Sequence, residues 1–177
     1  MKGVIFNIVE EVVAAAYGPD MWDHLLGQAG LDGIYTSVGS YPDTQLEALV
    51  VAASGETGLP ASDMLRIIGR HAIPRLHDRF PAFFENAGDA RTFILGLNHI
   101  IHPEVRKLYA GAGCPHFHFT LADRAVTLGY NSPRRLCHLA EGFVLGLADH
   151  FAETIAVGQT ACMHAGDPSC QIELGWS

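Results

Sequence analysis

Hydrophobic residues recur every three or four positions through residues 4–102, which is the period of helices buried along one face. Residues 4–16 are apolar nearly all the way round and should be deeply buried, whereas 30–42 are rich in Gly, Ser and Tyr and should form a loop. Pro74 should bend or break the helix that contains it. The helices predicted from this pattern cover residues 4–16, 21–28, 43–53, 62–79 and 89–102, with Asp43 and Asp89 as N-caps and a connection at 81–88.

The period of the pattern changes after Gly113. Apolar and polar residues alternate over 117–121, which predicts a half-buried strand, and 125–129 should return as its hairpin partner. A helix over 133–151 and a second hairpin, 155–163 with 170–176, should follow. The predicted fold class is therefore α+β, with a helical N-terminal half packed against a C-terminal four-stranded antiparallel sheet that has a long helix between its two hairpins.

Composition narrows the class of protein. With 177 residues, 49% of them hydrophobic and 17% charged, the chain should form a single domain over residues 1–177 with a substantial core. A formal net charge of −8 disfavours nucleic acid or an anionic membrane as the main partner. Glu10 and Glu11 interrupt the apolar start before it could act as a signal peptide, and no apolar run reaches the ~20 residues that span a bilayer. We therefore expect a cytoplasmic protein with reduced cysteines.

His102 is the first candidate for chemistry. It ends an apolar helical pattern and is followed by Pro103, which disfavours helix at the preceding residue. The helix should therefore stop at His102 and leave an imidazole beside an accessible break, where it could ligate a metal or a haem iron. The alternative is a core histidine whose nitrogens are paired with backbone. His99 precedes it by three residues and is expected to be packed or partly exposed rather than a ligand.

The segment GYNSPR at 129–134 is the second candidate. In an extended chain Tyr130, Ser132 and Arg134 point to one side. Ser132 followed by Pro133 also resembles an N-cap and first helical residue. Together these groups could bind carboxylates or phosphates, although a tyrosine at a strand end and a Ser-Pro helix start are each common without a ligand.

Three stretches of the chain resemble one family. HPEVRKLY at 102–109, Y-x-S-x-R at 130–134 and the opening MKGVIFNIVEE are similar to the haem nitric oxide/oxygen binding (H-NOX) family, the bacterial relatives of the haem domain of soluble guanylate cyclase. The resemblance covers the whole chain and implies haem b between its two halves. It implies that His102 ligates the iron, that Tyr130, Ser132 and Arg134 hold the propionates, and that Ile5 and Pro115 pack against the porphyrin and bend it.

The resemblance also bears on which gas is bound. Oxygen-binding members carry a distal tyrosine five residues after the arginine of Y-x-S-x-R, and here that residue is Leu139. Val9, Phe143 and Val144 should complete an apolar distal side, with His138 rotated away by ~100°. The chain should therefore sense nitric oxide, bind carbon monoxide as well, and exclude oxygen. His102 should be released when nitric oxide binds. We see no output domain, so the signal should pass to a separate histidine kinase or cyclic-di-GMP enzyme, and the chain itself should not be an enzyme.

Cys137, Cys162 and Cys170 resemble the three cysteines with which many proteobacterial members bind zinc. The family's histidine ligand falls at Gln159, so His164 or His138 would have to replace it in a tetrahedral site. The other interpretation is a group of buried thiols without metal. A cysteine or zinc redox-sensing regulatory protein is accordingly the alternative function. A metal-dependent enzyme is disfavoured because the histidines are scattered and form no H-x-x-x-H motif.

Overall fold

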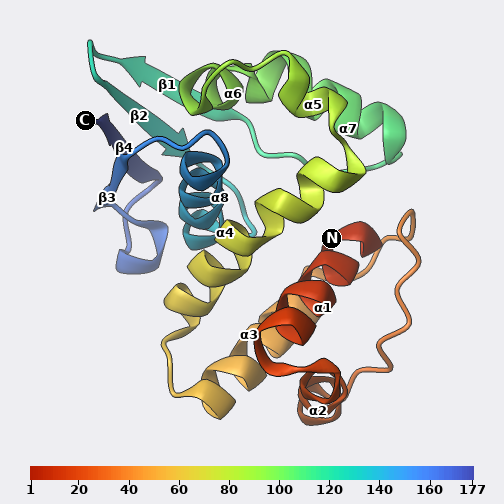
Figure 1. Cartoon of the computed structure of the whole chain (residues 1–177). Helices are drawn as coiled ribbons and strands as arrows, with labels where there is room; N and C mark the ends of the chain where they lie inside the picture. The colour runs from red at the N-terminus through yellow and green to blue at the C-terminus, as the bar shows by residue number, and fades with distance from the viewer.

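The computed structural model describes residues 1–177, and it divides into a helical N-terminal half and a half built on a sheet (Figure 1). One face of the first helix carries Phe6, Val9 and Val13 into a buried cluster with the next two helices, while Ile8 and Val12 on another face pack near Ala72. The helices of this half are α1 (Gly3–Tyr17), α2 (Pro19–Ala29), α3 (Asp43–Thr57) and α4 (Ala61–Arg79).

The predicted loop at 30–42 is confirmed, and it folds back on the start of α1. Lys2 and Ser40 form an isolated β-bridge. Gly3 is required there, because a Cβ at this position would collide with the carbonyl of Thr36.

The C-terminal half is a four-stranded antiparallel sheet in the order β1-β2-β4-β3, which confirms the predicted fold class. The strands are β1 (Phe117–Leu121), β2 (Ala125–Tyr130), β3 (Ile155–Ala161) and β4 (Cys170–Trp176). The register sets Phe117 opposite Tyr130 and Tyr130 opposite Cys170. Helix α8 (Cys137–His150) connects the two hairpins and packs beside the sheet (Figure 1).

Helices α4 and α8 lie against each other almost backbone to backbone, and α4 runs between the two halves (Figure 1). A Cβ on Gly69 would lie 2.9 Å from the Cα of Gly142, and a Cβ on Gly142 or Gly146 would collide with a carbonyl of α4. A bend or break was expected at Pro74, and α4 does not break there but continues to Arg79.

The segment around His102 differs from the prediction. The helix does not stop there: α6 (Ala90–Gly96) passes into a π-helical turn (Leu97–Ile101) and then into α7 (His102–Leu108). Pro103 sits in the first turn of α7, where a proline is tolerated better than further along a helix. The π-turn lets the His102 N–H donate to the Leu97 carbonyl, five residues back, and so carries the chain past the proline.

The connection at 81–88 contains a short helix, α5 (Ala82–Glu85), which the sequence pattern did not predict. The helix predicted from Pro133 begins only at Cys137, after a turn in which Arg135 has φ +50°. Other predicted boundaries shift by a few residues, and Asp89 caps α6 by accepting a hydrogen bond from the Thr92 N–H at 2.6 Å.

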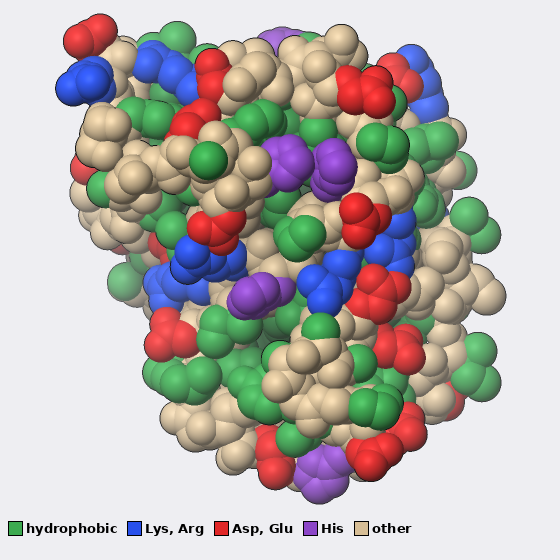
Figure 2. Space-filling view, in the orientation of Figure 1, with side chains coloured by type: hydrophobic (Ala, Val, Ile, Leu, Met, Phe, Trp, Pro, Cys, Tyr) green, Lys and Arg blue, Asp and Glu red, His purple; other side chains and the backbone are tan.

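No helix of the structure is both long enough and apolar enough to span a lipid bilayer. Over the face drawn in Figure 2, basic side chains lie among acidic and hydrophobic ones and do not merge into one basic patch.

Candidate functional site

A cavity of about 370 Å³ lies between the two halves, and 25 of its 33 lining residues are hydrophobic. Its walls come from α1, α4, the segment from α5 to Phe117, strand β2 and α8. An apolar cavity of this size with a few polar groups is typical of a small-molecule or cofactor site.

His102 lines the cavity and is not paired in the way that a structural core histidine would be. Its Nδ1 is buried and has no hydrogen-bond partner. Burial lowers the pKa of His102 to about 4, the positive charge of Arg106 acts in the same direction, and a backbone contact at Pro115 opposes them. The imidazole is therefore neutral at pH 7, and one of its two ring nitrogens carries a lone pair of the kind that binds a metal.

Tyr130, Ser132 and Arg134 all line the same cavity, as their alternation predicted. The Tyr130 hydroxyl accepts a hydrogen bond from the Leu136 N–H at 3.0 Å, and burial raises the pKa of Tyr130. Ser132 is not a helix N-cap, because α8 begins at Cys137. Its Oγ accepts instead from the Arg134 N–H at 3.3 Å, within the turn before the helix.

The Arg134 side chain is held by two parts of the chain that sequence reasoning did not connect with it. Its Nε donates to Asp43 Oδ2 at 2.8 Å, and its Nη1 donates to the Gly113 carbonyl at 2.6 Å. Asp43 was predicted to cap α3, but it is the first residue of that helix, after Pro42. Although desolvation opposes it, hydrogen bonds from the Met1 nitrogen and Arg134 keep the pKa of Asp43 below its usual value. A Cβ on Gly113 would come within 3.0 Å of Arg134 Nη2, so glycine makes room for the guanidinium.

Most of the residues predicted to form an apolar side of the cavity do line it. Leu139, Phe143 and Val144 of α8 line the cavity, as do Ile5 and Pro115. Val9 does not. It is 2% exposed and packs away from the cavity, in the buried cluster that also holds Leu139.

The cavity also has a feature that the sequence pattern did not single out, namely the phenol of Tyr109 in its lining. His138 does not reach the cavity, and its Nδ1 lies 3.2 Å from Oε2 of Glu141. Glu141 is only 3% exposed and accepts a hydrogen bond from Arg66 Nε at 2.6 Å. His99 is exposed and does not line the cavity, whereas half-buried Cys114 does.

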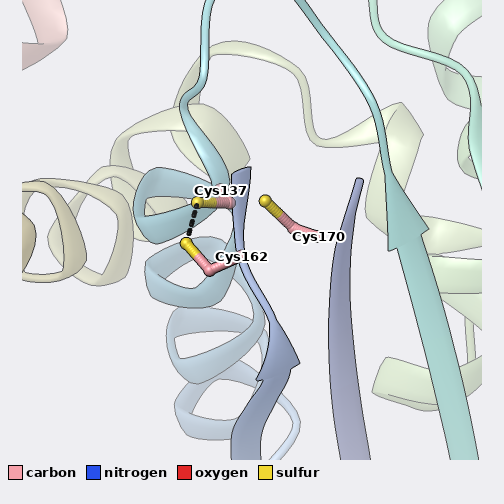
Figure 3. A group of neighbouring side chains, drawn as sticks. All are labelled: Cys137, Cys162 and Cys170. Carbon is pink, nitrogen blue, oxygen red and sulfur yellow. Dashed lines mark hydrogen bonds between the residues drawn. The ribbon is translucent and has the colours of Figure 1, made fainter. Parts of the chain in front are cut away.

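The structure brings together Cys137, Cys162 and Cys170, from the start of α8, the end of β3 and the start of β4 (Figure 3). Their sulfur atoms all lie within 4.8 Å of one another, and those of Cys137 and Cys162 are 4.0 Å apart. Burial raises the pKa of Cys137 to about 12, and the neighbouring thiol of Cys170 acts in the same direction.

Two candidates for a fourth ligand lie to one side of the thiols. His164 and His138 form a separate close group with Cys137 alone. The Nε2 of His164 is 2.7 Å from the Arg135 carbonyl. Gln159 has a buried Nε2 without a partner.

Comparison with known proteins identifies one family. Residues 2–159 match the haem-NO-binding family. The chain is similar to an H-NOX protein from Shewanella oneidensis whose structures are known in the Fe(II)NO and Fe(II)CO states. The identities are 33% and 32%, the TM-scores are 0.94 and 0.91, and both comparisons cover 100% of this chain and 99% of the other. It is also 27% identical to the bacteriochlorophyll synthase 23 kDa chain of Cereibacter sphaeroides, over 92% of this chain and 84% of that one.

Proposed function

The chain belongs to the haem-NO-binding (H-NOX) family, and from that premise we propose that residues 1–177 form one haem-based gas sensor with His102 as the iron ligand. One observation carries the proposal most strongly: His102, a neutral imidazole, lines a large apolar cavity, and its buried Nδ1 has no hydrogen-bond partner. A structural histidine would have its nitrogens paired.

The remaining residues of the cavity fit haem b. The hydrophobic lining suits a porphyrin, and Ile5 and Pro115 belong to that lining. Haem also carries two propionates, which need donors near the aqueous edge. Tyr130, Ser132 and Arg134 supply a phenol, a hydroxyl and a guanidinium, and Arg134 Nη2 remains free of protein partners. When bound, haem would supply a ferrous iron that takes up a diatomic gas.

We propose that the gas is nitric oxide, with carbon monoxide also bound and oxygen excluded. Bound oxygen is polar and is stabilised by a hydrogen-bond donor, whereas nitric oxide binds ferrous haem without one. Leu139, Phe143 and Val144 offer no donor. His102 would hold the iron of the haem, and we propose that it would be released when nitric oxide binds.

We further propose that the protein is not an enzyme and that it works in the cytoplasm, with neither nucleic acid nor membrane as its partner. The signal would pass to a separate histidine kinase or cyclic-di-GMP enzyme. Release of His102 would change the positions of α7 and its neighbours, and the partner would have to bind the two states differently.

The experiment is a spectrum of the purified, reduced protein and of two variants. His102→Gly should lose the wild-type haem spectrum, and free imidazole in the medium should restore it. His99→Gly, at an exposed position one turn away, is the matched control and should keep the wild-type spectrum. If His102→Gly keeps full haem content and an unchanged spectrum without added imidazole, His102 is not the ligand.

A second candidate function, a cysteine or zinc redox switch, is favoured by the three clustered thiols. Cys137, Cys162 and Cys170 could bind zinc with His164 as a fourth ligand, but this would require His164, which is grouped with Cys137 alone, to approach Cys162 and Cys170 as well. The two functions predict different properties of the purified protein. A haem sensor should be coloured and show a Soret band, whereas a zinc switch should be colourless and contain zinc. Loss of zinc in Cys162→Ser but not in Cys114→Ser would support the thiol site.

A further inference from the structure

The side-chain amide of Asn98 joins the π-helical turn to the sheet. Its Nδ2 donates to the Phe117 carbonyl at 2.7 Å, and its Oδ1 accepts from the Phe117 N–H at 3.0 Å. Phe117 begins β1, which is an edge strand, so an additional strand would ordinarily be needed to pair these backbone groups. An amide offers one donor and one acceptor side by side, and Asn98 therefore takes the place of a residue in such a strand.

This contact is made at the turn that positions His102. Asn98 directly follows Leu97, whose carbonyl accepts the His102 N–H across the π-turn. A π-turn is less favourable than α-helix and often marks a functional site. Here it is held in place by a side chain that reaches 19 residues along the chain.

Phe117 connects the amide with the cavity. Its ring is 7% exposed, lies 5.8 Å from the His102 ring between centroids, and lies 6.0 Å from the Tyr130 ring. All three rings line the cavity. Asn98 thus fixes the backbone of the aromatic residue that separates the candidate iron ligand from a candidate propionate ligand.

We propose that Asn98 is a positioning residue for His102, and that its amide sets how readily His102 leaves the iron. The inference rests on the proposed function, because it takes His102 as the ligand. Without the amide, the π-turn and Phe117 can move independently, and the position of the Phe117 ring beside His102 is no longer fixed. Asn98 itself does not line the cavity and is not a ligand.

The test compares Asn98→Ala and Asn98→Asp with His99→Ala in the haem-loaded ferrous protein. Asp keeps the size of Asn and can still accept from Phe117, but its carboxylate cannot donate to the Phe117 carbonyl. His99 is the neighbouring exposed residue of the same turn. Three quantities are measured: amide exchange of the Phe117 N–H by NMR, the iron–histidine stretching band by resonance Raman, and the rate at which histidine coordination is lost after mixing with nitric oxide.

We expect Asn98→Ala to speed exchange at Phe117 by about three- to tenfold, the range of one net hydrogen bond. The iron–histidine band should shift or broaden, and histidine coordination should be lost at least about threefold faster. His99→Ala should match the wild type in all three. If exchange at Phe117 accelerates while the band and the rate stay as in the wild type, the amide only completes the strand and the proposal is wrong. If Asn98→Ala does not fold, Asn98→Asp is judged by the same criteria. A wild-type protein without an iron–histidine band would instead refute the proposed function.

Discussion

Arg134→Ala tests whether the polar end of the cavity holds carboxylates. The guanidinium is fixed by Asp43 Oδ2 at 2.8 Å and the Gly113 carbonyl at 2.6 Å, which leaves Nη2 for a ligand without further ordering of the side chain. A charge-assisted hydrogen bond to a propionate should contribute about 1.5–3 kcal/mol, against about 1 kcal/mol for the Ser132 hydroxyl. With about 1.4 kcal/mol for each factor of ten, Arg134→Ala should release haem roughly ten- to a hundredfold faster and Ser132→Ala about fivefold faster.

The assay is transfer of haem to an excess of a haem scavenger, followed by absorbance. Arg124→Ala removes an exposed arginine outside the cavity and is the control for a general loss of positive charge. Equal release rates for Arg134→Ala and Ser132→Ala would refute the assignment of Arg134 as the stronger propionate contact. The same conclusion would follow if Arg134→Ala matched Arg124→Ala.

The other predictions concern pH, packing and gas selectivity. His102 has a folded-state pKa of about 4 against an ordinary value of 6.5, so on acidification the unfolded chain is protonated first, and stability should fall between those values. Thermal unfolding of the haem-free protein should show this loss of stability at low pH, and the loss should be smaller in His102→Gln. If the two proteins have the same dependence of melting temperature on pH, the prediction is wrong. Asp43 acts in the same direction, but only below its ordinary pKa of 3.8. Gly142→Ala should cost about 1–3 kcal/mol, since its Cβ would collide with the α4 backbone, whereas Gly55→Ala has open space and should not lower the melting temperature. The reduced protein should form no stable oxygen complex in air, and Leu139→Tyr should begin to confer one. A stable complex in the unmodified protein that Tyr109→Phe abolishes would show that Tyr109 is the donor and that the apolar-side argument is wrong.

The spacing of apolar and polar residues was sufficient to predict those elements of the fold that follow from a local helical or strand period. Alternation over 117–121 predicted β1, and the charge and hydroxyls of 130–134 predicted one polar group that the structure brings to the cavity. The same residues misled on the start of α8. Ser132 and Pro133 fit a helix start as well as a turn, and the turn is held by contacts that local spacing does not reveal, such as the hydrogen bond from the Leu136 N–H to the Tyr130 hydroxyl.

Contacts between distant segments left no local signal. Asp43 and Arg134 are 91 positions apart, and a first-turn aspartate is normally explained by the helix alone. The π-turn was equally hidden, because the pattern before His102 has ordinary helical spacing and Pro103 favoured a helix end. Val9 was misplaced because α1 is apolar nearly all the way round, so period could not show which of its faces meets the cavity.

The two sides of the cavity are joined to the rest of the protein in different ways, and this bears on where a signal could arise. On one side, α4 and α8 meet through Gly69, Gly142 and Gly146, where the absence of a Cβ lets the two backbones pack closely against each other. On the other side, single side chains make the connections: Asn98 holds the π-turn to β1, and Arg134 holds the loop at Gly113. A hydrogen bond of this kind contributes only about 1–3 kcal/mol, which is within the range that ligand binding can shift. We therefore expect α4 and α8 to stay together while the segment that carries His102 changes position.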